Sequence, residues 1–109
     1  MKALAIDTST SVAGIALVDE KGLLAEYALN DRKTHSQKLV PMLRELLGSM
    51  NMTPADVDIF AAVTGPGSFT GIRIGVTTVK ALAYAAQKPT AGVTSLDALA
   101  SAVAAGPDA

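Results

Sequence analysis

The first thirty residues contain three short apolar runs separated by brief polar turns. The runs cover residues 3–7, 12–18 and 23–29, and the turns between them lie at 8–11 and 19–22. Runs of this length with such interruptions predict β-strands joined as an antiparallel meander. The runs are apolar without clean alternation, which indicates that both faces of the sheet are at least partly covered.

After residue 34 the apolar positions follow a helical period. Thr34 and Gln37 have the spacing of a capping box, which predicts a helix start there. Pro41 lies inside the pattern, so the helix either starts later or bends at this residue. The apolar positions are Leu39, Val40, Leu43, Leu46, Leu47 and Met50.

The second half of the chain alternates predicted strands and helices. Residues 58–64 predict a buried strand, which leads into a glycine loop at 65–71 and a helix ending near Gln87. A short strand at 91–93 and an Ala-rich helix follow. The polar positions of the long helix form one narrow stripe: Arg73, Thr77, Lys80, Tyr84 and Gln87.

The order of these elements predicts an α/β fold. Strand–helix–strand units require parallel pairing and right-handed crossovers, whereas the first three strands pair antiparallel. A five-stranded mixed sheet with the first strand in the centre satisfies both conditions, and this is the ribonuclease H-like arrangement. We expect one lobe over residues 1–104 and a frayed tail at 105–109.

Composition narrows the classes of function. The chain has 109 residues, of which 50% are hydrophobic and 4% aromatic, so we expect one small domain with an aliphatic core. Nine Lys and Arg against ten Asp and Glu give a net charge of −1, which argues against direct nucleic-acid binding. The absence of cysteine excludes disulfides, thiolate metal sites and a Cys nucleophile.

The sequence also bears on localisation. No apolar stretch approaches the roughly 20 residues of a membrane span. Asp7 interrupts the first apolar run before a signal peptide forms, so we expect a soluble cytoplasmic protein.

The glycine loop is the first candidate site. Glycines between a strand and a helix expose backbone amides that hold anions. The glycine spacing G-x-G-x-x-x-G differs by one residue from the dinucleotide-binding fingerprint G-x-G-x-x-G. The loop also lacks the Gly-Lys-Ser/Thr of a P-loop. The same spacing is equally compatible with a glycine turn that binds no ligand. Asp7 is equally well explained as a cap for the turn after the first strand. The candidate phosphate-binding residues are Asp7, Thr8, Thr10, Gly65, Gly67, Ser68 and Gly71.

Four segments carry a resemblance to a known family. The string GPGSFTGIRIG at 65–75 resembles the signature of the TsaB (YeaZ) family. The segments AIDTST at 5–10, HSQKLVP at 35–41 and GVTSL at 92–96 are similar to further segments of that family. The resemblance implies an actin-like (ASKHA) fold and a role in making threonylcarbamoyladenosine at position 37 of tRNAs that read ANN codons.

The resemblance also implies partners. In that family's pathway a TsaD subunit carries the chemistry, TsaB is its dimerisation partner, and the ATPase TsaE joins the assembly. This implies a homodimer when the chain is alone and contact with tRNA only through the complex. We expect no cofactor on the chain alone and ATP or ADP with magnesium at the complex interface. Relatives usually carry a second lobe, and the chain resembles the N-terminal half alone.

The residues do not predict an independent enzyme. The catalytic relatives hold a metal with an H-x-x-x-H pair, whereas His35 is the single histidine here. No Ser-His-Asp arrangement has supporting context, so we expect neither a metal site nor hydrolase activity. The alternative is an actin-like ATPase or phosphotransferase half-domain that uses Asp7 and the loop at 65–71.

The two long helices are the second candidate site. The polar stripe of the helix at 71–87 is narrow, which predicts an apolar surface left for a partner. The resemblance implies that both helices pair with TsaD or with a second copy. The alternative is that the two helices pack only on each other and on the sheet and bind no partner. The predicted interface residues are Leu39, Leu43, Arg73, Val76, Lys80 and Ala83.

Overall fold

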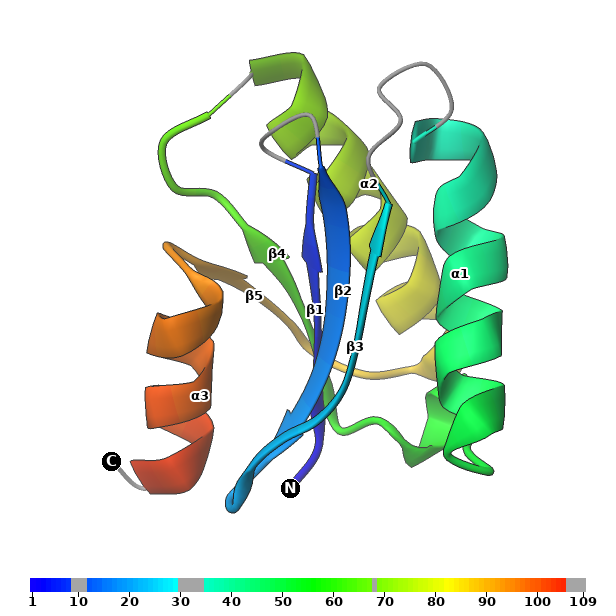
Figure 1. Ribbon diagram of the computed structural model, residues 1–109, viewed down its shortest axis with the longest axis vertical. Helices are drawn as coiled ribbons and strands as arrows, with labels where there is room; N and C mark the ends of the chain where they lie inside the picture. Colours follow the sequence, from blue (N-terminus) through cyan, green and yellow to red (C-terminus); the bar gives the residue numbers. More distant parts are fainter. Residues whose placement is uncertain (9–11, 30–34, 68, 106–109) are drawn as a thin grey trace.

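The computed structural model describes residues 1–8, 12–29, 35–67 and 69–105 (Figure 1). Its element order matches the one expected from the hydrophobic pattern. The elements are β1 (Ala3–Asp7), β2 (Ala13–Asp19), β3 (Gly22–Leu29), α1 (His35–Ser49), the 3-10 turn η2 (Pro54–Asp56), β4 (Ile59–Val63), α2 (Phe69–Ala86), β5 (Thr90–Val93) and α3 (Leu96–Ala105).

The strands form one mixed sheet in the order β3-β2-β1-β4-β5. β1 pairs antiparallel with β2 and parallel with β4, and β4 pairs parallel with β5. The predicted five-stranded sheet with its first strand in the centre is therefore confirmed.

Helices cover both faces of the sheet. Figure 1 shows α1 and α2 on one face and α3 on the other. In β1, Leu4 and Ile6 belong to the core beneath α1 and α2, whereas Ala3 and Ala5 pack with residues of α3. In the inner strands β1, β2 and β4 both faces are buried, which explains why their sequences show no apolar–polar alternation.

α1 runs from His35 to Ser49 with Pro41 inside it, so the later start that this proline suggested is not adopted. The predicted cap, Thr34, lies outside the described residues. The apolar face of α1 is buried in the core: Leu39, Leu43, Leu46 and Leu47. Among the described residues, no helix combines the length and apolar character that crossing a membrane requires.

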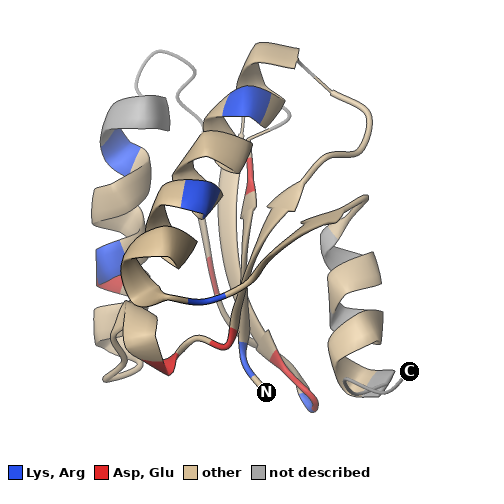
Figure 2. Ribbon diagram, turned by 180° about the vertical axis from the view of Figure 1, so that it is seen from behind, with Lys and Arg blue, Asp and Glu red and all other residues tan. Residues whose placement is uncertain are grey.

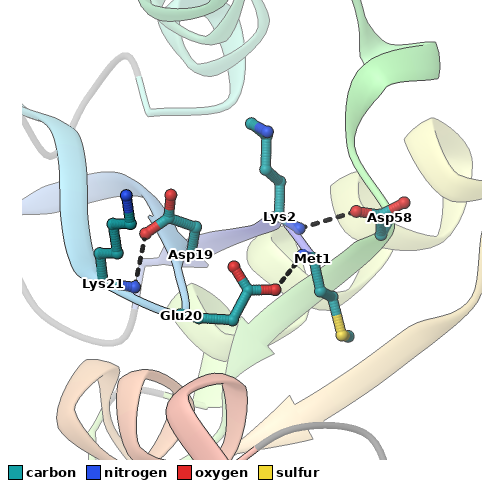
Figure 3. Close-up of polar contacts among 6 residues, drawn as sticks. All are labelled: Met1, Lys2, Asp19, Glu20, Lys21 and Asp58. Carbon is teal, nitrogen blue, oxygen red and sulfur yellow. Dashed lines mark hydrogen bonds and ion pairs between the residues drawn. The ribbon is translucent and has the colours of Figure 1, made fainter.

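Polar contacts close the amino end of β1 (Figure 3). The ammonium group of Met1 forms an ion pair with Glu20 in the turn between β2 and β3. The backbone N–H of Lys2 donates to the carboxylate of Asp58 over 2.7 Å. The hydrogen bond from the terminal ammonium lowers the pKa of the Glu20 carboxyl. The carboxyl end of β1 lies at the opposite edge, where both the glycine loop and the start of α2 are placed.

Candidate functional site

The candidate phosphate site lies at the carboxyl ends of the parallel strands, where α/β sheets usually bind ligands. β1 ends at Asp7, and β4 ends at Val63 before the glycine loop leads into α2 (Figure 1). The structure thus places Asp7, Thr8 and the loop at one edge of the sheet. Two other candidates, Thr10 and Ser68, lie outside the described residues.

Thr8 and Gly71 contact each other directly. The Thr8 hydroxyl donates to the Gly71 carbonyl over 2.5 Å, and the residue is only 1% exposed. A Cβ at Gly75 would lie 2.7 Å from the same hydroxyl oxygen, so even alanine at this position would force the Thr8 side chain to shift. Thr8, Gly71 and Gly75 thus pack the first turns of α2 against the end of β1. Thr8 and Gly71 are predicted phosphate ligands, and both take part in this packing.

Gly65 also has a packing role. A Cβ on this residue would lie 2.3 Å from the carbonyl oxygen of Thr94, which precedes α3. The backbone N–H of Thr64 donates to the Val93 carbonyl over 2.7 Å, extending the contact between β4 and β5. The loop therefore starts against the backbone of the segment that follows β5, whereas Gly67 is exposed.

Asp7 supplies a carboxylate at this edge. It is half-buried and pairs in the β-ladder with Gly14 of β2. The described part of the chain contains no group of three or more His, Cys, Asp or Glu that could hold a metal ion. An anionic ligand at this edge would meet the backbone of the glycine loop, and a magnesium ion would have Asp7 as its protein carboxylate.

The outer face of α2 is the second candidate site. Every residue of the predicted polar stripe is exposed, which confirms that the stripe faces solvent. Two aromatic side chains lie on the same helix: Phe69 is 75% exposed and Tyr84 is 88% exposed. The Arg73 guanidinium carbon lies 5.9 Å from the centre of the Phe69 ring.

The predicted partner interface divides into buried and exposed residues. Leu39, Leu43 and Ala83 are at most 2% exposed and belong to the core beneath α1 and α2. They therefore hold the helices to the sheet, and a partner cannot reach them on the folded chain. Arg73 and Lys80 are exposed and Val76 is half-buried, so for these three the interface remains a prediction.

Two exposed aromatic candidates on this face, Phe69 and Tyr84, were not singled out from the sequence. Tyr84 was assigned to the polar stripe, and Phe69 was treated as part of the glycine loop. A signal for both was present in the composition. The chain has only two Phe and two Tyr, and one of each falls within the same helix.

Comparison with protein families gives one match over most of the chain. Residues 22–109 match the family model described as "TsaD: tRNA N6-adenosine threonylcarbamoyltransferase".

Individual relatives agree with this match. The chain is 44% identical over 100 residues to the tRNA threonylcarbamoyladenosine biosynthesis protein TsaB of Bacillus subtilis, covering 92% of this chain and 44% of the relative. The structure of YeaZ from Pseudomonas aeruginosa has a TM-score of 0.77 and 39% identity, covering 87% of this chain and 44% of that one. The chain thus spans less than half the length of these relatives.

A more distant structure supports the fold. RuvC of Thermus thermophilus has a TM-score of 0.59 at 15% identity, covering 84% of this chain and 63% of that one. At this identity the likeness concerns the fold alone, and it identifies the mixed sheet with its flanking helices as ribonuclease H-like. The chain belongs to the family that the matching model describes and, within it, to the TsaB (YeaZ) proteins.

Proposed function

We propose that this chain acts in the biosynthesis of tRNA threonylcarbamoyladenosine as a non-catalytic subunit that binds a TsaD-type catalytic subunit. A TsaE-type ATPase joins the assembly, the chain forms a homodimer when it is alone, and tRNA is reached through the complex. The names of the relatives support the pathway. The exposed aromatic face of α2 is the observation that supports the scaffold role.

The contacts made at the carboxyl ends of the parallel strands support a structural role for the polar groups there. The Thr8 hydroxyl is engaged by the Gly71 carbonyl, and Gly65 is packed against Thr94. A buried polar group that already has its partner loses that hydrogen bond if it turns to a ligand. Three of the candidate phosphate-binding residues, Thr8, Gly65 and Gly71, therefore have contacts within the fold that explain them without a ligand.

The outer face of α2 supports binding of another protein. Tyr84 is 88% exposed, and the small side chains of Ala81 and Ala85 beside it are also exposed. Small residues next to an aromatic one let a second helix approach closely and give it an anchor, and tyrosine is enriched among residues that dominate interface energy.

The proposal is tested by binding to the TsaD-type subunit of the same organism. We expect Tyr84→Glu to weaken the complex by about tenfold or more, because a charge replaces an aromatic anchor. Leu23→Glu is the matched control: Leu23 is 58% exposed but lies on β3, away from α2. Light scattering coupled to size exclusion and titration calorimetry measure both variants. An unmodified chain that fails to bind, or equal affinities for both variants, would contradict the proposal.

The position of Asp7 beside the glycine loop favours a second candidate, an actin-like ATPase or phosphotransferase half-domain. In this case Asp7 would bind magnesium, and the amides around Gly67 would bind the phosphates of ATP. Calorimetry with ATP and magnesium, followed by measurement of phosphate release, tests it. We would then expect Asp7→Asn to remove both signals. Nucleotide binding that is unaffected by this change would count against the assignment of Asp7.

A further inference from the structure

β5 (Thr90–Val93) is the last strand of the sheet, and no described strand lies beyond it. The Pro89 and Val93 carbonyls accept hydrogen bonds from the N–H groups of Phe60 and Thr64, so both face β4. Backbone groups of a strand alternate between its two edges. The N–H and C=O of Thr90 and Gly92 therefore point to the outer edge, where they match the ladder of an added strand.

A groove lies next to this edge on the face that α2 covers. Its volume is about 240 Å³, and most of its walls are apolar. Thr90, Ala91 and Gly92 of β5 form one side and Val76, Val79 and Lys80 of α2 form the other, with Ala62 and Thr64 of β4 also lining it. Because side chains alternate along a strand, an added strand would direct every second side chain into this groove.

The charged residues in the segment from β4 through β5 are all cationic. Residues 59–96 contain Arg73, Lys80 and Lys88 and no Asp or Glu, although the whole chain has a net charge of −1. Figure 2 shows that the charged positions of α2 are all cationic. Lys80 lines the groove, and Lys88 lies in the turn that leads into β5.

The acids that precede β4, Asp56 and Asp58, are not among the residues that line the groove, and each carboxylate accepts a hydrogen bond from a backbone N–H. Asp56 accepts a hydrogen bond from the backbone N–H of Thr53 over 2.8 Å, and Asp58 accepts one from that of Lys2 over 2.7 Å. Figure 3 shows the second of these contacts at the amino end of β1.

We propose that the edge of β5 and the adjoining groove bind an extended, acidic segment of another protein, which adds to the sheet as a sixth strand. The outer backbone groups of Thr90 and Gly92 supply the pairing, the groove takes apolar side chains, and Lys80 and Lys88 select carboxylates. Lys80 also belongs to the exposed stripe of α2 that carries Tyr84, whereas Thr90 and Gly92 lie on β5, so the test of the backbone groups does not depend on the scaffold role proposed above.

The charge pattern favours this occupant over two others. A second copy of the chain paired edge to edge would bring its own Lys80 and Lys88 against the same cations, which disfavours association. A nucleic acid would be attracted by the cations, but it offers no backbone ladder for Thr90 and Gly92 and no apolar side chains for the groove.

The probe is a capped eight-residue peptide that alternates Val and Glu, with a Val–Lys peptide as its charge control. We expect the Val–Glu peptide to bind and to slow the hydrogen exchange of the Thr90 and Gly92 amides, as measured by NMR on the labelled chain. The amides of Ala91 and Val93 should change little, because they already face β4. Equal binding of the Val–Lys peptide, or no slowing at Thr90 and Gly92, would overturn the proposal.

Two variants test the backbone and the charge separately. Gly92→Pro removes the outward N–H, so we expect at least about a tenfold loss of affinity. Gly92→Ala is its control: it keeps the N–H, and its Cβ would meet the Thr64 side chain at an ordinary 3.5 Å. Lys80→Glu should cause a comparable loss of affinity for the Val–Glu peptide. Lys80 is exposed, so this substitution should not disturb folding, and it tests the proposal even if Gly92→Pro fails to fold.

The competing occupants give distinct results. A chain that dimerises without peptide and loses this dimer in Gly92→Pro would replace the proposal with a second copy as occupant. Protection of the same two amides by a single-stranded RNA oligonucleotide, but not by the Val–Glu peptide, would also overturn it.

Discussion

The two ends of β1 are held in place by different kinds of contact. At its amino end, exposed carboxylates form the contacts: Glu20 pairs with the Met1 ammonium, and Asp58 accepts a hydrogen bond from the backbone N–H of Lys2. At its carboxyl end, the buried Thr8 hydroxyl contacts Gly71, and Gly75 lies against the same side chain. Exposed ion pairs contribute little to stability, whereas close packing is sensitive to single atoms. Substitutions at the carboxyl end should therefore cost far more than substitutions at the amino end.

The largest effect is expected for Gly65→Ala. The added Cβ would lie 2.3 Å from the Thr94 carbonyl oxygen, and a backbone atom cannot move aside without shifting the start of α3. We expect a loss of about 2 to 3 kcal/mol in the free energy of unfolding, measured by urea denaturation.

Gly48→Ala is the control for this substitution. Gly48 is exposed on α1, and a Cβ there would meet nothing within 4 Å. We expect a gain of up to about 1 kcal/mol, because alanine is the better helix former. Equal effects of the two substitutions would refute the packing role of Gly65.

A double-mutant cycle between Thr8 and Gly75 comes next in size. Thr8→Ala leaves the Gly71 carbonyl without this donor and should cost about 1 to 2 kcal/mol. Gly75→Ala places a Cβ 2.7 Å from the Thr8 hydroxyl oxygen and should cost about 1 to 3 kcal/mol.

The double variant should cost less than the sum of the two changes, because Thr8→Ala removes the hydroxyl that the new methyl group meets. Unfolding free energies of the four proteins give the coupling directly. Additive costs would show that the two residues do not act on each other.

The smallest effect is expected for Glu20→Gln at the amino end. The terminal ammonium lowers the pKa of Glu20 in the folded chain, so the ion pair stabilises the fold above the unfolded pKa. This contribution is lost as the pH falls through the folded pKa, where the original chain and the variant should become equally stable.

Urea denaturation across the acidic range measures this difference, and added salt should reduce it because the pair is exposed. A difference that grows as the pH falls would have the wrong sign for this ion pair.

Much of the fold was predictable because it depends on local pattern. The apolar runs identified the strands, and the requirement for right-handed crossovers placed β1 in the centre of the sheet. The polar stripe of α2 was also visible in the sequence, because a helical period fixes which residues share a face, and all five of its residues are exposed.

The candidate site was less predictable because its contacts join distant segments. Thr8 and Gly71 are separated by 63 positions in the chain, and no local pattern indicates that they meet. From the sequence, the glycines were therefore compatible both with a ligand-binding loop and with a turn that binds no ligand, and their packing role was not visible. Leu39, Leu43 and Ala83 were assigned to a partner because periodicity identifies an apolar face but not what covers it, and here the sheet and the neighbouring helix do.

The unequal sizes of side chains along β1 have one more consequence. Leu4 and Ile6 point to the side of α1 and α2, and Ala3 and Ala5 point to the side of α3. If the central strand slipped by a single position against its neighbours, bulky groups would collide with α3 and voids would open under the other two helices. The alternation of large and small residues thus permits only one register of β1 against its neighbours β2 and β4.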